Sequence, residues 1–581
     1  MDKEEVIKIL KEISVLLELK DENSFKIRAY QNSARSLEAS DIDFGKDLKI
    51  DSLTKIKGIG QHIAESIKEL VDTGSLKFYE DLKKTVPPGL VEMLAIPTMG
   101  PKKIKYLFDN LQVSSTGELE YACIENRLVD LPNFGRKTQE NILKGIEVLK
   151  KYKGRYLFAN IIEEAEVIHN KIQNFQYVNR SSLAGSVRRK KEIVKDIDIV
   201  ASTDNPDKVM DFFTGLSEAE DIIARGDTKS SIRLKSGINV DIRTVDDFQY
   251  PYALHHFTGS KEHNTAMRTA AKKDNIKMNE YGLFKNGNLI KCSDETGIFN
   301  FFSMDWIPPE LRENYGEIEA AKNKTLPKLI EEKDIKGIFH IHTTHSDGNI
   351  SIEQTCNYLQ KMGFQYAGIS EHSRTASYAG GLKDDDINRY LEEIDKLNQK
   401  YTGFKIFKGI ESDILLDGNL DYSDHILSKF DFIIAAIHSS FNLSEEQMTD
   451  RIIKAIENKF TTMIAHPTGR LLLARDPYKV DIIRIINAAA ENDVDIELNS
   501  SPFRLDLDWR MCKYAKEKGV KIFINPDAHS LKNLDDYKFG VNIARKGWLE
   551  KEDVPNTLSA KEIEIYLKNK KIKKQSKSIS I

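Results

Sequence analysis

Apolar residues in the first 150 positions recur at helical spacing, and short glycine-containing turns separate the apolar stretches. Residues 5–19 (EVIKILKEISVLLEL) and residues 62–74 (HIAESIKELVDTG) repeat apolar side chains every three or four positions. This spacing forms one apolar face of a helix. We therefore predict a series of short amphipathic helices up to about residue 150.

The pattern changes to mixed strands and helices from about residue 155 to 315. β-Branched runs at 197–202 (IDIVAS), 231–236 (SIRLKS) and 238–245 (INVDIRTV) lie between helical stretches. Runs of this composition indicate strands, so this section is predicted to be α/β. The polar segment that follows, GEIEAAKNKTLPKLIEEKD, is expected to be a linker.

Seven apolar, strand-like runs then alternate with amphipathic helices. Strand and helix alternation over about 230 residues predicts a parallel barrel. The runs are GIFHIH (337–342), YAGIS (366–370), FKIFKGIE (404–411), FDFIIAAIH (430–438), TTMIAH (461–466), VDIELN (494–499) and KIFINPD (521–527). The basic tail from 566 (YLKNKKIKKQSKSISI) is expected to be disordered and to be able to contact phosphates.

Composition limits the class of protein but does not reveal its function. A chain of 581 residues is too long for one core, and three to five domains are expected. There is no apolar run long enough to cross a bilayer, and the four cysteines are scattered along the chain. The acidic start MDKEEVIKIL lacks the order of a signal peptide, so a cytoplasmic protein is expected. The net charge of −4 does not by itself suggest a nucleic-acid partner.

Glycine turns repeat between helices of the first section. Gly58 and Gly60 enclose one turn, Gly135 lies in a second, and Gly100 lies in a weaker third. Such turns enter helix N-termini, where backbone N–H groups can hold a DNA phosphate without reading bases. One glycine turn alone would more often just close a helical hairpin. Repetition beside Lys and Arg favours phosphate binding at Gly58, Gly60, Gly100 and Gly135.

A carboxylate motif marks the second section. Asp196 and Asp198 alternate on a predicted strand, so they share one face, and Asp241 lies in a second strand of the same pattern. Three convergent carboxylates can hold two divalent ions for an in-line phosphoryl displacement, and Mg²⁺ suits oxygen ligands. Two such aspartates alone usually mark only an exposed strand edge. Here the segment Gly185-Ser186-Val187-Arg188-Arg189, expected to follow a helix, lies just upstream, and together with Asp241 it favours the metal site.

Together GSVRR, DIDIV, INVDIR and FTGSKEHNTAMR resemble the family X DNA polymerases, the group that contains DNA polymerase beta, over residues 1 to about 315. The resemblance implies that Asp196, Asp198 and Asp241 bind Mg²⁺, with Asp241 helping to deprotonate the primer 3′-hydroxyl. It implies a nucleotide site formed by Gly185, Ser186, Arg189, His256, Phe257, Gly259, Lys261, Asn264 and Arg268. Ser186 and Arg189 would hold the triphosphate, Phe257 and Gly259 would line the sugar pocket, and Asn264 and Arg268 would face the nascent pair. His256 replaces a usual Tyr, Lys261 a usual Asp, and Ser66 the lysine that forms a Schiff base in lyases of this family.

Histidines and carboxylates gather at the ends of the apolar runs in the third section. His340 and His342 alternate on one run, and six of the thirteen histidines lie at such ends beside Asp or Glu. Strand ends of a parallel barrel meet at one face, where active sites of such barrels lie. A single histidine here would more often be an ordinary hydrogen-bonded residue, but coincidence explains six poorly. Mixed imidazole and carboxylate ligands suit Zn²⁺ or Mn²⁺.

This pattern resembles the PHP (polymerase and histidinol phosphatase) phosphoesterase domain over about residues 335–575. The resemblance implies a trinuclear metal site with nine ligands: His340, His342, Asp347, His372, Glu411, His438, His466, Asp527 and His529. A family X polymerase followed by a PHP domain is the arrangement of the bacterial and archaeal enzymes.

The predicted fold is multidomain, α followed by α/β, and ends in a distorted seven-stranded barrel. The expected domains are a helix-hairpin-helix domain (1–90), a fingers-like domain with a second helix-hairpin-helix (91–154), a nucleotidyltransferase palm with a mixed sheet (155–250), a thumb-like domain (251–316), a linker (317–334), a PHP domain (335–575) and a disordered tail (576–581).

The predicted function is DNA polymerisation that fills short repair gaps, with a Mn²⁺-dependent 3′→5′ exonuclease in the PHP domain. Removal of 3′-phosphates and cleavage at abasic sites are plausible extensions. The expected partners are gapped or primer-template DNA and dNTPs, with no membrane, and the chain is expected to be a monomer. Two alternatives remain open at this point: a small-molecule phosphatase of the histidinol-phosphatase type tethered to a DNA-binding module, and a gap-recognising protein that recruits others.

Overall fold

The computed structural model describes residues 1–581 apart from 39, 41, 43, 45–47, 130, 151–153, 580 and 581. The chain divides into two compact units, Met1–Leu149 and Lys150–Ile581. Each has its own hydrophobic core. In the described part of the chain, no helix combines the length and apolar character needed to cross a membrane.

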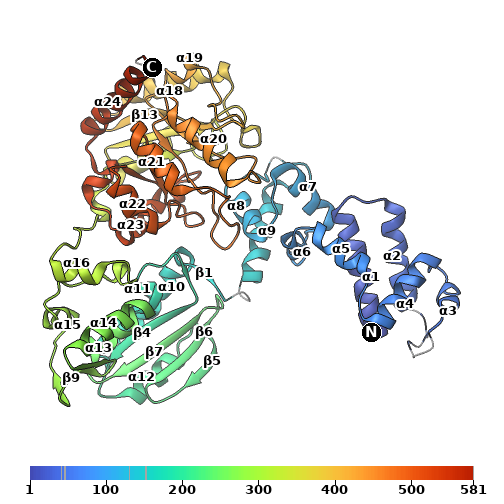
Figure 1. Ribbon diagram of the computed structural model, residues 1–581, viewed down its shortest axis with the longest axis horizontal. Helices are drawn as coiled ribbons and strands as arrows, with labels where there is room; N and C mark the ends of the chain where they lie inside the picture. The colour runs from blue at the N-terminus through green and yellow to red at the C-terminus, as the bar shows by residue number, and fades with distance from the viewer. Residues whose placement is uncertain are drawn as a thin grey trace. The chain divides into compact units, whose positions relative to one another are not determined.

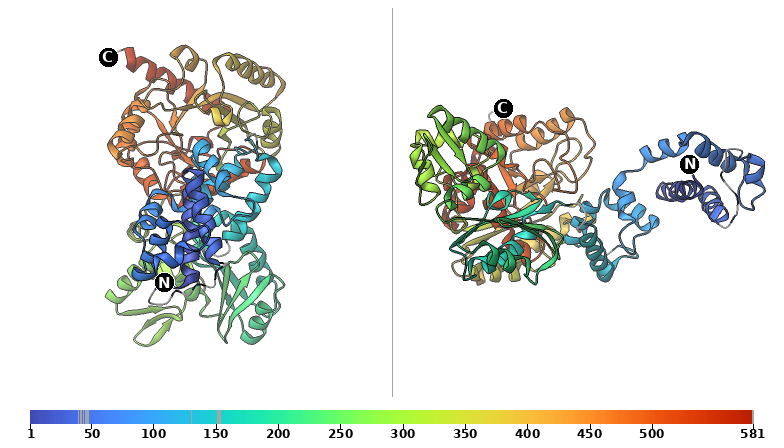
Figure 2. Two further views of the ribbon diagram at one scale, coloured as in Figure 1. Left: turned by 90° about the vertical axis from the view of Figure 1, so that its right-hand side faces the viewer. Right: turned by 90° about the horizontal axis from the view of Figure 1, so that it is seen from below.

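All of the secondary-structure elements described in the first unit are helices, drawn from blue to cyan in Figure 2. The apolar faces of these helices form one core, which includes Leu10, Leu17 and Ile67. The helices are α1 (Lys3–Leu19), α2 (Ser24–Glu38), α3 (Ile50–Thr54), α4 (Gln61–Thr73), α5 (Lys77–Thr85), α6 (Pro88–Met93), α7 (Pro101–Leu111), α8 (Thr116–Ile124) and α9 (Gly135–Lys150). The helical expectation for this section is confirmed.

The predicted glycine turns lie directly before helices. Gly60 is the N-cap of α4 and Gly100 is the N-cap of α7, and neither helix start has a side-chain cap. Gly58 has φ +101° and Gly135, the first residue of α9, has φ +65°. Only glycine adopts such values without strain. The turns therefore leave backbone N–H groups of the first helical turns uncapped by side chains at α4 and α7.

The second unit begins with a five-stranded mixed sheet in the order β2-β4-β7-β6-β5. β4 runs parallel to β7, and the other pairs are antiparallel. Helices α10 (Phe158–Gln173) and α12 (Pro206–Thr214) contribute Ile161, Ile168 and Phe213 to the core of the sheet. The strands are β2 (Arg180–Leu183), β4 (Asp196–Ser202), β5 (Ala219–Arg225), β6 (Lys229–Leu234) and β7 (Asn239–Val245), and β1 (Tyr156–Leu157) pairs with β3 (Ile193–Val194) beside them.

A smaller subdomain follows the sheet. Its elements are α13 (Tyr250–Thr258), α14 (Lys261–Lys273), β8 (Ile276–Asn279), β9 (Gly282–Lys285), β10 (Asn288–Ile290), α15 (Glu295–Phe301) and the 3₁₀ turn Pro309–Leu311.

The segment expected to be a linker is in part a packed helix, which corrects that expectation. α16 (Glu317–Asn323) buries Ile318 and Ala321 in the core that holds Met267 and Phe299. The carboxylate of Glu317 is fully buried and accepts a 2.6 Å hydrogen bond from His263 Nδ1. Glu317, one of the charged residues from which the linker was predicted, therefore has the buried partner His263.

The third section is a seven-stranded parallel sheet in sequential order, as predicted from the seven apolar runs. The strands are β11 (Gly337–Ile341), β12 (Tyr366–His372), β13 (Lys405–Asp413), β14 (Phe432–Ala436), β15 (Met463–Ile464), β16 (Asp495–Asn499) and β17 (Ile522–Asn525). His342 N donates to Ala528 O at 2.9 Å, and Ala528 N donates to His340 O at 3.0 Å. The chain just beyond β17 thus joins β11 and closes the sheet into a barrel.

Helices cover the outside of the barrel (Figure 1). They are α17 (Ile352–Lys361), α18 (Asp384–Lys400), α19 (Asp424–Leu427), α20 (Glu445–Glu457), α21 (Ile482–Asn492), α22 (Trp509–Glu517), α23 (Tyr537–Lys546) and α24 (Ala560–Ile579).

The expectation of a disordered basic tail is wrong for the residues that the structure describes, because α24 continues to Ile579. Residues 580 and 581 lie outside the described residues. Lys574 donates to Ile456 O and Thr461 O, while Lys570 pairs with Asp495 at 2.8 Å. These ammonium groups bind the barrel instead of facing solvent, where they would contact phosphates.

Candidate active sites

The three predicted carboxylates of the mixed sheet lie on two neighbouring strands. Asp198 of β4 is directly opposite Asp241 of β7 in the parallel register, and Asp196 lies two residues before Asp198. Ile197, between them, is fully buried in the core, whereas both aspartates are partly exposed on the other face. The strand periodicity therefore brings the three carboxylates to one face of the sheet.

Burial and mutual repulsion shape the electrostatics of this group. Burial, followed by the charges of Asp196 and Asp241, raises the pKa of Asp198 to about 7. The pKa of Asp196 is raised by burial and by Asp241. Lys229 Nζ lies 2.5 Å from Asp241 Oδ2 and partly offsets the negative charge. A cluster of oxygen ligands that repel one another fits divalent cations such as Mg²⁺.

The Gly185 segment lies against the carboxylates, although it follows strand β2 and not a helix as expected. Gly185 begins the single-turn helix α11 (Gly185–Arg188) with φ +58°. A Cβ at this position would lie 2.0 Å from Asp198 Oδ2. Only glycine permits this close approach. Arg189, at the end of the same short segment, is near enough to Asp198 to lower its pKa against the effect of burial.

Arg189, expected to hold a triphosphate, is buried and already paired. Its Nε lies 3.0 Å from Glu313 Oε1, and its Nη1 donates to Thr258 O at 2.7 Å. Arg188 forms a separate pair with Glu295, 2.6 Å between Nη2 and Oε2.

The other residues of the expected nucleotide site surround the end of α13. Asn264 Nδ2 donates to His256 O at 2.7 Å and to Gly259 O at 3.1 Å, so it holds this turn. The rings of His256 and Phe257 meet edge to face, with their centroids 5.0 Å apart. Arg268 Nε donates to Asn264 O at 3.2 Å, and both Arg268 and Lys261 are exposed.

The structure brings all nine residues of the predicted barrel site together. They form four overlapping groups, and within each group the potential ligand atoms lie within 4.8 Å of one another. The groups are His342, Asp347, His372 and His529; His340, His466 and Asp527; His340, His342 and Glu411; and His372, Glu411 and His438.

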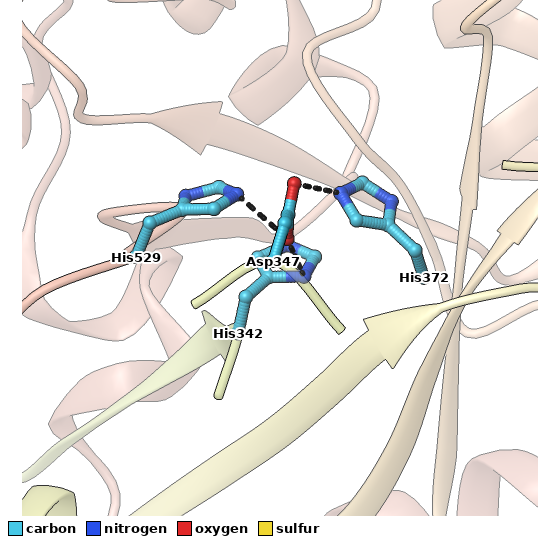
Figure 3. Close-up of side chains that lie close together, drawn as sticks. All are labelled: His342, Asp347, His372 and His529. Carbon is cyan, nitrogen blue, oxygen red and sulfur yellow. Dashed lines mark ion pairs between the residues drawn. The ribbon is translucent and has the colours of Figure 1, made fainter. Parts of the chain in front are cut away.

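Glu411 lies at the centre of the site, where its two oxygens meet imidazoles from several strands. Oε1 is 3.2 Å from His340 Nε2 and 3.1 Å from His466 Nε2, and Oε2 is 2.9 Å from His372 Nδ1. Such a carboxylate can bridge metal ions. His342, His372 and His529 surround Asp347 (Figure 3), with His529 Nε2 3.3 Å from its Oδ1.

The donor atoms of this site fit a metal centre. His342 Nδ1 and Nε2, His372 Nε2 and Asp347 Oδ2 are buried and have no hydrogen-bond partner among the described residues. Leaving several buried polar atoms without hydrogen bonds is costly, and metal coordination would satisfy them. The charges of Asp347 and Glu411 outweigh burial and raise the pKa of His372 well above its usual value. A metal cation at this site would offset the same carboxylate charges.

Carboxylates outside the predicted ligand set orient the histidines, and the sequence reasoning missed them. Glu497 Oε1 is 2.6 Å from His340 Nδ1, and its Oε2 accepts from His466 N at 2.9 Å. Asp413 Oδ1 is 2.5 Å from His438 Nδ1. Partners of this kind fix the ring orientation of metal-binding histidines. The sequence signal for Glu497 was an acidic residue within the apolar strand VDIELN. The signal for Asp413 was an acidic residue two positions after Glu411.

The backbone of the site departs from regular strand geometry at three ligands. His340 has φ +57°, His466 +24° and Asp527 +53°. Residues other than glycine rarely adopt these values, and such strain is typical of functional sites. His340 and His342 therefore do not follow simple strand alternation, although their rings still lie 5.2 Å apart in the same site.

Four family models match separate parts of the chain. Residues 1–76 match a helix-hairpin-helix domain, and residues 90–147 match a SAM-like helix-hairpin-helix tandem. Residues 253–313 match the DNA polymerase beta thumb, and residues 339–501 match the PHP domain.

Similar proteins cover either the whole chain or the barrel alone. The chain is 39% identical to the DNA polymerase/3′-5′ exonuclease PolX of Bacillus subtilis (strain 168) over 98% of this chain and 100% of that one. Its barrel section, 40% of the chain, is 31% identical to a probable phosphatase of Thermoanaerobacter sp. (strain X514), of which it covers 95%.

The fold and the two sites define a DNA polymerase core joined to a PHP phosphoesterase barrel. The chain belongs to the family X DNA polymerases that carry a C-terminal PHP domain.

Proposed function

We propose that the chain is a DNA-directed DNA polymerase with a 3′→5′ exonuclease in the same polypeptide. The observation that carries the proposal is the presence of two complete sets of site residues, three carboxylates on β4 and β7 and nine ligands in the barrel. The full-length similarity to the Bacillus subtilis polymerase/exonuclease supports it. A tethered small-molecule phosphatase would not need the carboxylate triad.

In the polymerase site the protein's own groups place the reacting oxygens. Asp196, Asp198 and Asp241 would hold Mg²⁺, which neutralises charge on the transferring phosphate. Asp241 would accept the proton of the primer 3′-hydroxyl. The triphosphate would lie against Ser186 and Arg189, and the nascent base pair against Asn264 and Arg268.

In the barrel the nine ligands would hold Mn²⁺ or Zn²⁺, which supply Lewis acidity toward a phosphodiester. Asp347 is partly exposed, whereas His340, Glu411 and His529 are buried.

Removal of a 3′-phosphate is a second candidate activity of the same site. The relatives that cover the barrel alone carry the name probable phosphatase. A site that accepts the 3′-terminal phosphodiester of DNA can also accept a phosphate monoester at the same 3′ position. Cleavage at abasic sites would be a third reaction of this site.

The working partners proposed are gapped or primer-template DNA and dNTPs, bound by a monomer in the cytoplasm. The uncapped N–H groups near Gly60 and Gly100, together with the turn at Gly135, would hold DNA phosphates on either side of a gap.

Separate inactivation of the two sites tests the proposal. With labelled gapped DNA, dNTPs and Mg²⁺ or Mn²⁺, Asp241→Ala should abolish nucleotide addition while digestion of the 3′ end continues. Its matched counterparts, His342→Ala and Asp527→Ala, should lose digestion and bound metal while extension continues.

Wild-type protein that extends no primer would contradict the polymerase assignment. Wild-type protein that carries no transition metal and digests no DNA with added Mn²⁺ would contradict the nuclease assignment. Glu517→Gln, an exposed carboxylate on α22, is the control that should change neither activity.

A further inference from the structure

The barrel contributes a buried lysine to the polymerase part of the second unit. Lys546, the last residue of α23, has a side chain with 0% exposure, and its Nζ lies 2.5 Å from Glu313 Oε1. It also donates to Arg189 O and to Glu310 O, both at 3.3 Å. The lysine therefore contacts the backbone of Arg189, the residue proposed to bind the triphosphate. It also contacts Glu313, which pairs with the Arg189 side chain.

Glu313 is shared by two cations that come from different domains. Its Oε1 lies 3.0 Å from Arg189 Nε and 2.5 Å from Lys546 Nζ. Without Lys546, Arg189 and Glu313 would form a neutral pair that attracts an anion weakly. With Lys546 the three groups carry a net positive charge, and burial keeps water from screening it.

The other charged groups near this cluster balance one another. Glu192 also faces Lys546, but two arginines offset the charges of Glu192 and Asp508. Arg470 lies 4.0 Å from Glu192 and 2.5 Å from Asp508, and Arg510 lies 2.7 Å from Asp508. Glu310 pairs with Arg545 at 2.8 Å. The ring of Trp509 lies 5.0 Å from Lys546 Nζ and closes the cluster on the barrel side. The surplus charge therefore lies on Arg189 and Lys546.

We propose that Lys546 of the PHP barrel is a positioning residue for nucleotide addition, which keeps Arg189 available to the dNTP triphosphate by neutralising Glu313. This inference rests on the proposed polymerase activity and on the proposed role of Arg189. It makes the barrel part of the nucleotide-binding apparatus, in addition to its own phosphoesterase site. Removing the lysine charge would leave Glu313 to hold Arg189 in a neutral pair.

The test is steady-state single-nucleotide addition to gapped DNA by full-length variants. Lys546→Met should raise the KM for dNTP by about tenfold while kcat stays within about twofold, because a positioning contact acts on substrate binding. Lys546→Arg, which keeps the charge, should stay near the wild-type KM. Lys538→Met is the matched control, since Lys538 lies on the same helix α23 but pairs with Asp535 at 3.7 Å instead of Glu313.

A double variant tests the charge argument directly. Glu313→Gln restores the net positive charge in a Lys546→Met background, so the double variant should bring the KM back to within about threefold of wild type. Barrel digestion of DNA 3′ ends, measured without dNTPs, checks that each variant is folded.

Three outcomes would overturn the inference: an unchanged KM in Lys546→Met, an equal rise in Lys538→Met, or no recovery in the double variant. A wild-type protein without any nucleotide addition would instead contradict the proposed function. Should Lys546→Met fail to fold, the inference is judged on Glu313→Gln alone. It is supported by a KM at or below the wild-type value and overturned by a raised KM.

Discussion

Glu295 is a buried carboxylate that two arginines share. Arg312 Nη1 lies 2.5 Å from its Oε1, and Arg188 Nη2 lies 2.6 Å from its Oε2. Burial opposes ionisation, but Arg312 and Arg188 outweigh it and lower the pKa from 4.5 to about 2. A pKa that is lower in the folded state means that ionised Glu295 stabilises the fold, by about 3 kcal/mol for this shift.

We expect Glu295→Gln to lower the free energy of unfolding by about 3 kcal/mol at pH 7, because it leaves two buried cations without their partner. The contribution of Glu295 is fully present above pH 4.5 and is lost as pH falls toward 2. The difference between wild type and variant in urea unfolding should therefore be constant from pH 5 to 8 and shrink below 4.5. An equal loss in Glu262→Gln, an exposed residue of α14, would refute this account.

Glu497 supports the barrel site without being a proposed ligand. It fixes the ring of His340 and the backbone of His466, and Asn525 Nδ2 donates to it at 3.1 Å. We expect Glu497→Gln to weaken metal binding by about 10- to 100-fold, as loss of such outer partners does. Metal titration followed by elemental analysis measures this. Unchanged affinity alongside the Glu517→Gln control would show that His340 needs no such support.

At the level of single residues, sequence periodicity predicted which candidate metal ligands lie close together. It did not predict which other side chains orient those ligands. Asp196 and Asp198 needed only the two-residue repeat of a strand, and the barrel ligands needed only their place at strand ends. Glu497 looked like any acidic residue in VDIELN, because its partner His340 lies 157 positions earlier in the chain. The pairing of Arg189 with Glu313 likewise depends on a contact across 124 positions.

At the scale of elements, helix α4 contains the position at which the family resemblance implies a lyase lysine. A 5′-deoxyribose phosphate lyase needs an amine to form a Schiff base. Ser66 stands at the expected lysine position, is buried, and donates to His62 O at 3.0 Å. Lys68, the nearest amine along the helix, pairs with Asp72 at 3.0 Å.

We therefore expect borohydride to trap little or no covalent adduct on residues 1–90 with an incised abasic substrate, although this part should still bind a 5′-phosphate. Ser66→Lys, which restores an amine at this position, is the matched variant in which an adduct is expected if the surroundings permit the reaction. A strong wild-type adduct mapped to residues 1–90 would refute the prediction.

Elements with strong periodicity were predicted well, and elements defined by distant partners were not. All seven barrel strands were predicted, because each combines an apolar run with polar ends. The segment containing α16 was predicted to be a linker from its charges, yet Glu317 is buried against His263. The basic tail was predicted to be disordered, but its lysines donate to barrel carbonyl groups that only the folded barrel presents.

In the molecule as a whole, the two sets of site residues come from segments of very different length. The carboxylates on β4 and β7 are close in sequence, and their sheet ends at Val245. The barrel ligands come from nearly every strand between β11 and the turn after β17, and Lys546 then connects the barrel to Glu313. Loss of one barrel strand would therefore remove ligands, whereas the carboxylate triad would retain its own two strands.

Closure of the barrel through His340, His342 and Ala528 has a consequence for biosynthesis. A ribosome makes the chain from the N-terminus, and domains tend to fold in that order. The carboxylate triad is complete once β7 has emerged, but His340 must wait for Ala528, and the barrel must wait further for α24 to cover it. A nascent chain thus possesses its carboxylate triad well before the nine residues of the barrel site can come together.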